Sequence, residues 1–329
     1  MNIARSISGV RAAVAAARRD GARVGIVPTM GYLHEGHLSL VDAARARGAA
    51  FIVASIFVNP SQFGPKEDFD TYPRDEARDV LLLESRGVDL VFAPAVAEIY
   101  PAGARATVHV RGLSERLEGE RRPGHFDGVA TVVTKLLNIV QPDLAVFGQK
   151  DAQQCAVISS LVRDLDLPVE LVIAPTLRES DGLAMSSRNA YLTAAERAVA
   201  PALHRALRSG AAAIARGSRD LAEVEAAMRA ELARTPGIEL DYLNLVDAAS
   251  YESPRDFNRN LILAGAARVG STRLIDNIPI AGVDTHDSFL SPIEDSPRDR
   301  DGSQRRVRGL DHDRPPPDER GGSRSLREG

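Results

Sequence analysis

The chain has 329 residues, with 41 Lys or Arg and 45 Asp or Glu, so its formal net charge is −4 and no nucleic-acid partner is predicted. This length exceeds that of one average domain and predicts two. The single cysteine, Cys155, excludes an intrachain disulfide framework and fits a reducing compartment. The N-terminal stretch lacks the apolar block of a signal peptide, and no apolar run reaches membrane-spanning length. We therefore expect a cytoplasmic protein with no membrane partner.

Strands and helices alternate along the first 175 residues. After a short amphipathic helix at the N-terminus, we expect strands at 23–28, 50–58, 89–93, 107–110, 144–147 and 169–174. Helices are expected at 35–47, 74–86, 128–140 and 150–164. This alternation predicts an α/β fold with a doubly wound, Rossmann-like parallel sheet in residues 1–175. Ligands of such folds bind outside the carboxyl ends of the strands.

The pattern changes from residue 176 onwards. Two helices are expected at 193–215 and 220–235, the first with Thr193 as N-cap and Glu196 completing a capping box. Strands are expected at 241–246, 261–267 and 273–276. Residues 176–282 are thus predicted to form a smaller α+β domain that acts as a lid. Residues 283–329 are rich in Arg, Asp, Ser and Pro and poor in apolar residues, which predicts a disordered tail.

The stretch 27–41, VPTMGYLHEGHLSLV, holds two histidines, His34 and His37, three residues apart. A β-branched run precedes them and apolar residues at helical spacing follow, which predicts a strand, a turn and a helix that begins near His37. Free backbone N–H groups at such a helix start favour an anion, and two imidazoles add to this preference. The spacing is not that of the HExxH zinc motif. Taken alone, the pair could also lie on a polar surface, but Gly31 and Gly36 favour a loop that approaches a ligand closely.

Polar clusters follow three further predicted strands, and parallel strands place such clusters at one edge of the sheet. Lys150 follows a glycine at the start of a predicted helix, where its ammonium can meet phosphate as a point charge. Ser186, Ser187 and Arg188 offer hydroxyls, backbone N–H groups and a guanidinium fork to a polyphosphate. Neither a P-loop nor a dinucleotide-binding glycine motif occurs in the sequence. These loops must therefore build the phosphate site.

Neutral amides accompany the charged groups. Gln62 and Gln154 follow two of the predicted strands and suit a small substrate that carries hydroxyl and carboxylate groups. His125 lies in the Gly/Pro-containing stretch RRPGHFDG, where it is expected to be either a lid residue or simply exposed. Cys155 lies in an apolar stretch and is expected to be buried and inert.

Several segments together resemble the pantothenate synthetase (pantoate–β-alanine ligase) family of the HIGH-type nucleotidyltransferase superfamily. They are VPTMGYLHEGHLSLV, SIFVNPSQFGPKEDFDTYPR, RPGHFDGVATVV, FGQKDAQQ, AMSSRNAYL and VGSTRLIDNI. The resemblance extends from the N-terminus to about residue 280. It implies a homodimeric ligase that condenses pantoate with β-alanine, using ATP and Mg²⁺. The reaction would pass through a pantoyl-adenylate and release AMP and pyrophosphate.

The resemblance also implies roles for individual residues. The catalytic group would be His34, His37, Lys150 and Arg188. ATP would be held by these four together with Met30, Gly31, Tyr32, Leu33, Glu35, Gly36, Gly148, Gln149, Asp151, Leu177, Met185, Ser186 and Ser187. Pantoate and β-alanine would be bound by Asn59, Gln62 and Gln154, and Asp79 would bind Mg²⁺ through water.

Three positions depart from the family pattern, and two other functions stay open. Gln149 stands where the family commonly has Glu, Ala152 where it often has Tyr, and Tyr32 where it usually has a small residue. The loop around Lys150 therefore carries a different charge balance, and Tyr32 would narrow the mouth of the ATP loop. One alternative is another HxGH enzyme that transfers a nucleotidyl group and releases only pyrophosphate. The other is a non-catalytic nucleotide-binding module.

Overall fold

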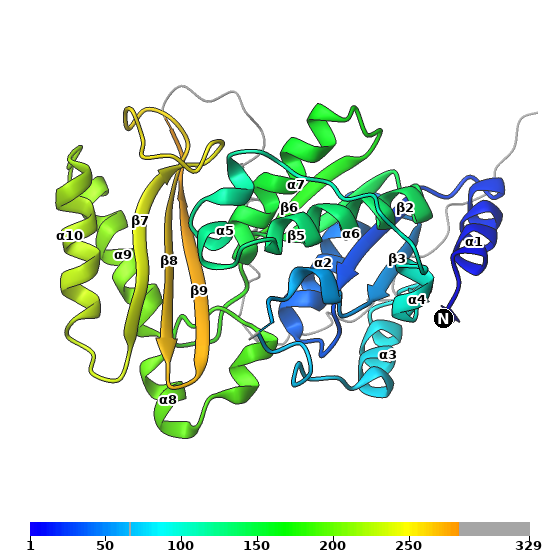
Figure 1. The fold of residues 1–329 in the computed structure, drawn as a ribbon, viewed down its shortest axis with the longest axis horizontal. Coiled ribbons are helices and arrows are strands. Elements are labelled where there is room, and N and C mark those ends of the chain that lie inside the picture. The colour runs from blue at the N-terminus through cyan, green and yellow to red at the C-terminus, as the bar shows by residue number, and fades with distance from the viewer. Residues whose placement is uncertain (66, 283–329) are drawn as a thin grey trace, which may run out of the picture. The chain divides into compact units, whose positions relative to one another are not determined.

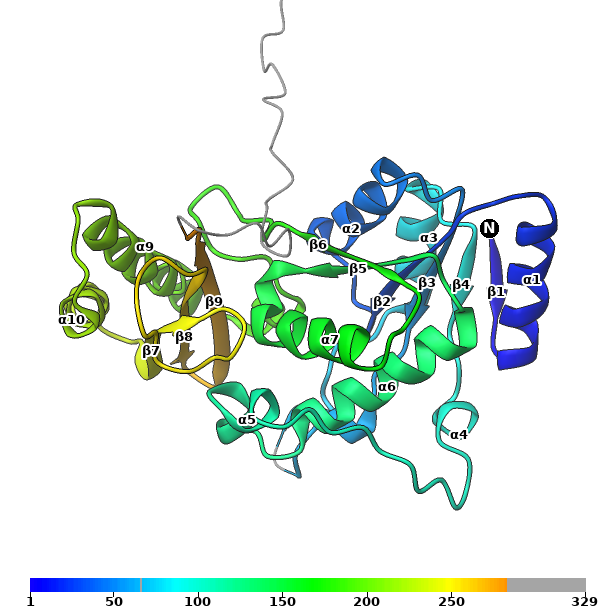
Figure 2. The same ribbon diagram turned by 90° about the horizontal axis from the view of Figure 1, so that it is seen from above.

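The computed structural model describes residues 1–65 and 67–282, and the tail predicted at 283–329 lies outside these described residues. A sheet of six parallel strands forms its larger part (Figure 1), in the spatial order β1-β4-β3-β2-β5-β6 (Figure 2). The strands are β1 (Asn2–Ala4), β2 (Val24–Thr29), β3 (Phe51–Ile56), β4 (Leu90–Phe92), β5 (Leu144–Gly148) and β6 (Glu170–Ala174). The α/β, doubly wound prediction is confirmed.

The strand order reverses between β2 and β5. From β2 the chain winds outward through β3 and β4, whereas β5 and β6 lie on the other side of β2. This reversal is the topological switch point, where α/β sheets bind their ligands at the carboxyl ends of the strands. The segment that follows β2 carries His34 and His37, and the segment that follows β5 carries Lys150.

Helices cover both faces of this sheet (Figure 2). The cluster of buried side chains on one face includes residues of α1 (Ile7–Arg19), α6 (His125–Val140) and α7 (Ala152–Asp164). The cluster on the other face includes residues of α2 (Glu35–Ala46) and α3 (Glu76–Ser85). The remaining short elements of this part are α4 (Val96–Ile99), α5 (Glu118–Arg121), and the 3₁₀ turns η1 (Pro60–Gln62), η2 (Leu113–Glu115) and η3 (Gln149–Asp151).

A second, antiparallel sheet is built from β7 (Glu239–Asp247), β8 (Leu261–Val269) and β9 (Thr272–Ile280). It follows the turn η4 (Ser187–Tyr191) and the helices α8 (Ala194–Val199), α9 (Ala202–Ala215) and α10 (Leu221–Leu232). Nearly every residue of the central strand, β8, is buried. Because side chains alternate between the two faces along a strand, β8 is buried on both faces. Leu261 and Leu263 pack with residues of α9 and α10, whereas Ile262 and Ala264 belong to the same cluster as α6 and α7. The smaller sheet therefore contacts the larger part of the fold directly.

The structure corrects two predicted elements and adds one strand, besides the short helices α4 and α5 and the 3₁₀ turns. The strand predicted at 107–110 is wrong, because this segment runs as irregular coil and the N–H of Val108 donates to the Thr131 hydroxyl on α6. The single helix predicted at 193–215 is also wrong, because it divides into α8 and α9 around Pro201, which has no N–H to continue the helix. Strand β1 was not predicted, since three residues are too few to show a periodicity.

That residues 176–282 form a separate lid domain stays a prediction.

Among residues 1–65 and 67–282, no helix combines the length and the apolar character needed to cross a bilayer.

Candidate active site

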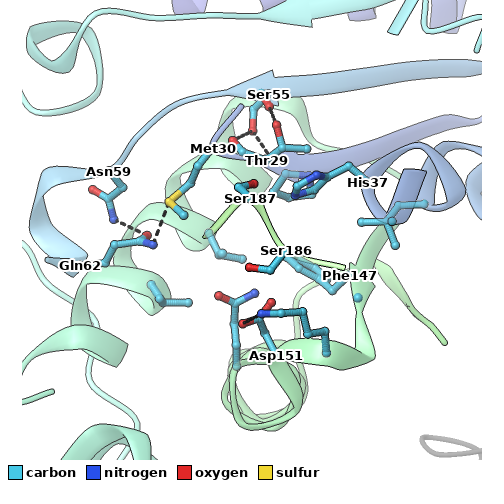
Figure 3. A pocket seen from close by; sticks show the side chains of 18 of the residues that line it. Thr29, Met30, His37, Ser55, Asn59, Gln62, Phe147, Asp151, Ser186 and Ser187 are labelled. Atoms are coloured by element: carbon cyan, nitrogen blue, oxygen red, sulfur yellow. Dashed lines mark hydrogen bonds and ion pairs between the residues drawn. The ribbon is translucent and has the colours of Figure 1, made fainter. Parts of the chain in front are cut away.

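The four polar loops singled out in the sequence line one cavity of about 200 Å³ at the carboxyl ends of the strands (Figure 3). Its lining includes Thr29 at the end of β2, Ser55 in β3, Gly148 at the end of β5 and Thr176 after β6. A second cavity of about 990 Å³ shares some of this lining, namely Arg122, Lys150, Asp151, Ser186 and Arg188. The two cavities together offer room for an elongated ligand.

The two histidines stand at the start of α2. His34 is the N-cap of this helix, His37 lies in its first turn, and their ring centroids are 4.1 Å apart. The backbone N–H of His34 donates to Nδ1 of His37 over 3.4 Å. The neutral ring of His37 therefore carries its proton on Nε2, which makes this nitrogen a hydrogen-bond donor.

Both imidazoles are neutral near pH 7. Burial, and then the charge of Lys150, lowers the pKa of His34 to about 4. Burial, followed by His34 and Lys150, lowers the pKa of His37 well below its usual value. Within the described part of the chain, Nδ1 of His34 is buried and has no hydrogen-bond partner. An anion bound beside the ring would favour its protonated form.

The loop before α2 is fixed by a buried carboxylate and a close packing contact. Asp79 on α3 is 1% exposed, and its two oxygens accept the backbone N–H groups of Tyr32 at 2.6 Å and Leu33 at 2.7 Å. A Cβ added to Gly36 would lie 2.9 Å from the His34 ring. A side chain at position 36 would therefore displace the His34 ring. Asp79 thus holds residues 30–34, the loop between β2 and α2, which we call the histidine loop. Its buried side chain is not accessible to a metal-bound water.

Cationic groups line the same cavity from two other loops. Lys150 lies in η3, just before α7, with its ammonium 3.6 Å from Oδ1 of Asp151. Arg188 makes two bonds of 2.9 Å to Asp68. The Ser187 hydroxyl donates over 3.1 Å to the carbonyl of Tyr32. This last bond joins the 185–188 loop to the histidine loop.

The opposite side of the cavity carries side-chain amides. Asn59 donates through its side-chain amide to Oε1 of Gln62 and to the carbonyl of Gly128, each over 3.1 Å. A Cβ on Gly128 would lie 2.3 Å from the carbonyl oxygen of Ser61, so only glycine lets α6 approach η1 this closely. Figure 3 shows Asn59 and Gln62 on one side of the cavity and His37 on the other. Gln154 lines the same cavity from α7.

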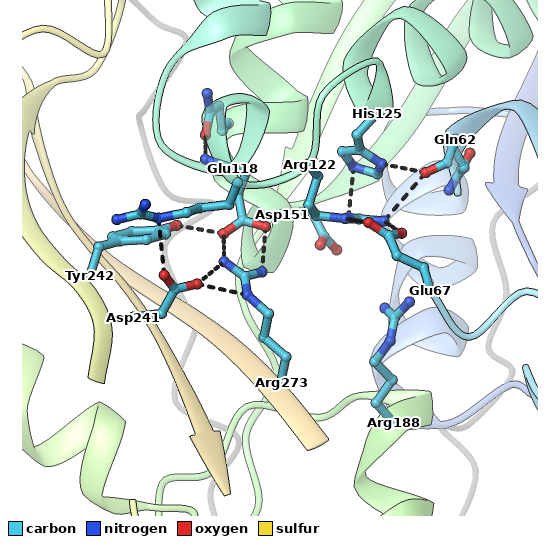
Figure 4. Close-up of polar contacts among 12 residues, drawn as sticks. Gln62, Glu67, Glu118, Arg122, His125, Asp151, Arg188, Asp241, Tyr242 and Arg273 are labelled. Carbon is cyan, nitrogen blue, oxygen red and sulfur yellow. Dashed lines mark hydrogen bonds and ion pairs between the residues drawn. The ribbon is translucent and has the colours of Figure 1, made fainter. Parts of the chain in front are cut away.

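Arg122 lines both cavities and is not among the site residues predicted from the sequence. Its Nε donates to Glu67 over 2.8 Å, and its Nη1 lies 3.0 Å from Nε2 of His125 (Figure 4). The His125 ring also contacts the backbone carbonyl of Gln62 at 2.8 Å, so this histidine is half-buried rather than exposed. Burial, and then the charge of Arg122, lowers the pKa of His125 to about 4. The sequence feature that could have indicated Arg122 is its position directly before Pro123 and Gly124 in the stretch that contains His125.

A neighbouring cluster ties α5 to the second sheet. Arg273 on β9 makes two bonds of 2.7 Å to Glu118, and the Tyr242 hydroxyl donates to the same carboxylate over 2.9 Å (Figure 4). Glu118 is 6% exposed, so this ion pair is largely shielded from solvent.

Most of the residues predicted to bind substrates line the first cavity. They are Met30, His34, Gly36, His37, Asn59, Gln62, Gly148, Lys150, Asp151, Gln154, Leu177, Met185, Ser186, Ser187 and Arg188. The other predicted ATP contacts lie outside this lining, and they are Gly31, Tyr32, Leu33, Glu35 and Gln149. The side chain of Glu35 pairs with Arg86, and that of Tyr32 lies under Arg78. The described residues contain no group of three or more His, Cys, Asp or Glu side chains that could hold a metal ion.

Comparison with known proteins bears on this arrangement. The family model "Pantoate-beta-alanine ligase" matches residues 2–279. The chain belongs to the pantoate–β-alanine ligase family. The pantothenate synthetase of Herpetosiphon aurantiacus is 55% identical over 279 residues, which cover 84% of this chain and 99% of that protein. That of Moorella thermoacetica is 54% identical over 278 residues, covering 84% and 98%.

Solved structures of pantoate–β-alanine ligases share the fold. A crystal structure of pantothenate synthetase from Thermus thermophilus has a TM-score of 0.79 at 47% identity, and covers 84% of this chain and 99% of that one. The ligase from Francisella tularensis, described as complexed with β,γ-ATP and β-alanine, has a TM-score of 0.68 at 33% identity, with 84% and 97% covered. The sequence-based resemblance to this family is confirmed.

Proposed function

We propose that this cavity condenses pantoate with β-alanine in two steps, through a pantoyl-adenylate. The chain is an ATP-dependent carbon–nitrogen ligase of the pantoate–β-alanine ligase family. The intermediate and the residue roles are the proposal. One observation carries it: an end with cationic side chains and an end with side-chain amides meet in a single cavity. This juxtaposition suits a reaction between a polyphosphate and a small hydroxy acid.

In the first step a carboxylate oxygen of pantoate attacks the α-phosphorus of ATP, and the bond to pyrophosphate breaks. The barrier lies in bringing anions together. His34 and His37 donate hydrogen bonds to the phosphates, while Lys150 and Arg188 neutralise the charge that develops in the transition state. Asn59, Gln62 and Gln154 orient pantoate, because its hydroxyl and carboxylate groups match amide donors and acceptors.

In the second step the β-alanine amine attacks the acyl carbon of the adenylate. The new C–N bond forms, the C–O bond to AMP breaks, and the amine gives up a proton. The mixed anhydride would react with water if the site were open, so water must be excluded. We propose that residues 176–282 act as the lid that excludes it, which the contacts of β9 with the active-site loops support.

The residues present fit a loosely held Mg²⁺ ion better than a dedicated metal site. Mg²⁺ usually keeps several waters and binds through one or two carboxylates together with substrate phosphates. Asp151 lines both cavities and its side chain is 46% exposed, so it is the carboxylate we propose to hold hydrated Mg²⁺ on ATP. The bound ion would supply further neutralisation of phosphate charge. The orientation of Asp79 toward the histidine loop gives no support to the magnesium role that the resemblance implies for it.

The family resemblance also leads us to propose a cytoplasmic homodimer. The single cysteine, whose thiol is buried and has a pKa raised by that burial, supports a reducing compartment. Sedimentation of the full chain would test the dimer, which predicts twice the chain mass of 35.3 kDa.

The function is tested by the products formed from each set of substrates. We expect AMP to accumulate only when ATP, Mg²⁺, pantoate and β-alanine are all supplied. Another HxGH nucleotidyltransferase would release pyrophosphate without AMP. A non-catalytic module would bind ATP without turnover, and either result would reject the proposal.

A further inference from the structure

Asn277 lies on β9 of the second sheet, and both polar atoms of its side chain form hydrogen bonds to the loop that carries Lys150. Its Nδ2 donates to the backbone carbonyls of Gln149 and Lys150, each over 2.9 Å. Its Oδ1 accepts from Nε2 of Gln149 over 3.3 Å. Asn277 is 4% exposed, so these bonds are shielded from water and their loss would leave buried carbonyls without a partner.

The preceding residue, Asp276, holds a second active-site loop in the same way. It is 5% exposed, and it receives two bonds from Arg178, at 2.7 Å and 2.9 Å. Burial raises the pKa of Asp276, but His204 and Arg178 outweigh it and keep that pKa below its usual value, so the carboxylate is ionised. The Arg178 side chain also donates to the carbonyl of Gly182 over 3.1 Å. The backbone of Arg178 forms an isolated antiparallel β-bridge with that of Ala184.

The segment that Arg178 fixes leads directly into Met185–Arg188. Two neighbouring residues of one strand thus hold two loops that lie far apart in sequence. One loop carries Lys150 and the other carries Ser186, Ser187 and Arg188. A strand within a sheet is a rigid support compared with either loop.

We infer that Asp276 and Asn277 are positioning residues that set the Lys150 loop and the 185–188 loop at a fixed spacing around the phosphates. This inference rests on the phosphate role proposed for Lys150. A lysine side chain is flexible, so the placement of its ammonium depends on where its backbone is held. Misplacement of a catalytic group by about 1 Å can cost on the order of 10²-fold in rate.

The competing explanation is that Asn277 only stabilises the fold. The two explanations differ in whether the effect of an Asn277 substitution on kcat depends on the presence of Lys150. We would measure turnover, KM values and melting temperature for Asn277→Ala and for the nearly isosteric Asn277→Asp, which cannot donate. Asn244→Ala is the matched control. It lies on the same rung of the sheet, across Ala264, and its side chain donates to Glu225 over 3.2 Å. Each Asn277 variant would also be combined with Lys150→Ala.

We expect Asn277→Ala to lower kcat about 10- to 100-fold, with the KM for pantoate nearly unchanged and Asn244→Ala close to wild type. In the Lys150→Ala background the same substitution should lower kcat by less than about threefold, since coupled residues are not additive. An equal loss in both backgrounds would overturn the inference. So would normal kcat in Asn277→Ala, or a failure of both variants to fold. If instead Lys150→Ala itself keeps near-normal turnover, it is the proposed phosphate role that fails.

Discussion

The two ends of the cavity are built from different chemistry. The phosphate end has two neutral imidazoles, Lys150 and Arg188, held by loops after β2, β5 and β6, and each of the two basic side chains is paired with an aspartate. The amide end has Asn59, Gln62 and Gln154, and the neighbouring Arg122 is paired with Glu67. Charge is placed where the reaction changes charge, and neutral hydrogen bonds are placed where a substrate only needs orientation.

The difference separates two kinds of catalytic contribution. A group that acts on developing charge contributes mainly to kcat, whereas a group that binds substrate and transition state equally contributes mainly to KM. Substitutions at the two ends should therefore fall into two kinetic classes.

The largest effect is expected at Lys150. Lys150→Ala should lower kcat by on the order of 10²–10³-fold, the typical cost of one preorganised electrostatic group, and should weaken ATP binding much less. Steady-state kinetics together with ATP titration would measure both quantities. Lys135→Ala is the matched control, because Lys135 lies on α6 outside the cavity lining and its ammonium faces the Tyr100 ring. Near-normal turnover in Lys150→Ala would remove the charged end from the mechanism.

A smaller and different effect is expected at Gln62. Gln62→Ala should raise the KM for pantoate by about 3- to 10-fold, as the loss of roughly 1 kcal/mol of hydrogen bonding implies. The kcat at saturating pantoate should change little. A large fall in kcat with an unchanged KM would place Gln62 in the same class as Lys150 and break the comparison.

The smallest effect concerns protons. In the free protein the pKa of His34 is about 4, lowered by burial and then by Lys150, so the ring is neutral at pH 5.5. A bound phosphate favours the imidazolium and raises that pKa, so ATP binding should take up a fraction of a proton between about pH 4 and 6.5.

Calorimetry in buffers of different ionisation enthalpy would measure this uptake at pH 5.5. It should be smaller in His34→Gln and unchanged in His109→Gln, because His109 pairs with Asp127 at 2.8 Å outside the cavity lining. Equal uptake in wild type and His34→Gln would show that His34 does not meet phosphate.

Much of the fold could be predicted from the sequence, because its elements are strongly patterned. The β-branched runs indicated the central strands, and the alternation of strands and helices indicated the parallel sheet. Local periodicity could not distinguish the coil at 107–110 from a strand, because that depends on a pairing partner far away in sequence. The break at Pro201 was missed although proline was the signal for it.

The site was predictable where one short segment defines it. The histidine pair at the start of α2 followed from spacing alone. Contacts that link distant segments were not predictable, such as Asn277 with the Lys150 loop. Asp79 had a recognisable signal, because it lies on the buried face of α3 four residues before Leu83. A buried carboxylate at an apolar position requires donors, and here these are the N–H groups of the histidine loop.

The central claim is that adenylation of pantoate at the charged end does not need β-alanine. Incubation with pantoate, ATP and Mg²⁺ alone should drive exchange of labelled pyrophosphate into ATP, because that half-reaction is reversible while the adenylate stays bound. His37→Ala should suppress this exchange, since the imidazole acts on phosphate rather than on the amine. Exchange that strictly requires β-alanine would mean a concerted reaction of three substrates, and would contradict the division of roles between the two ends of the cavity.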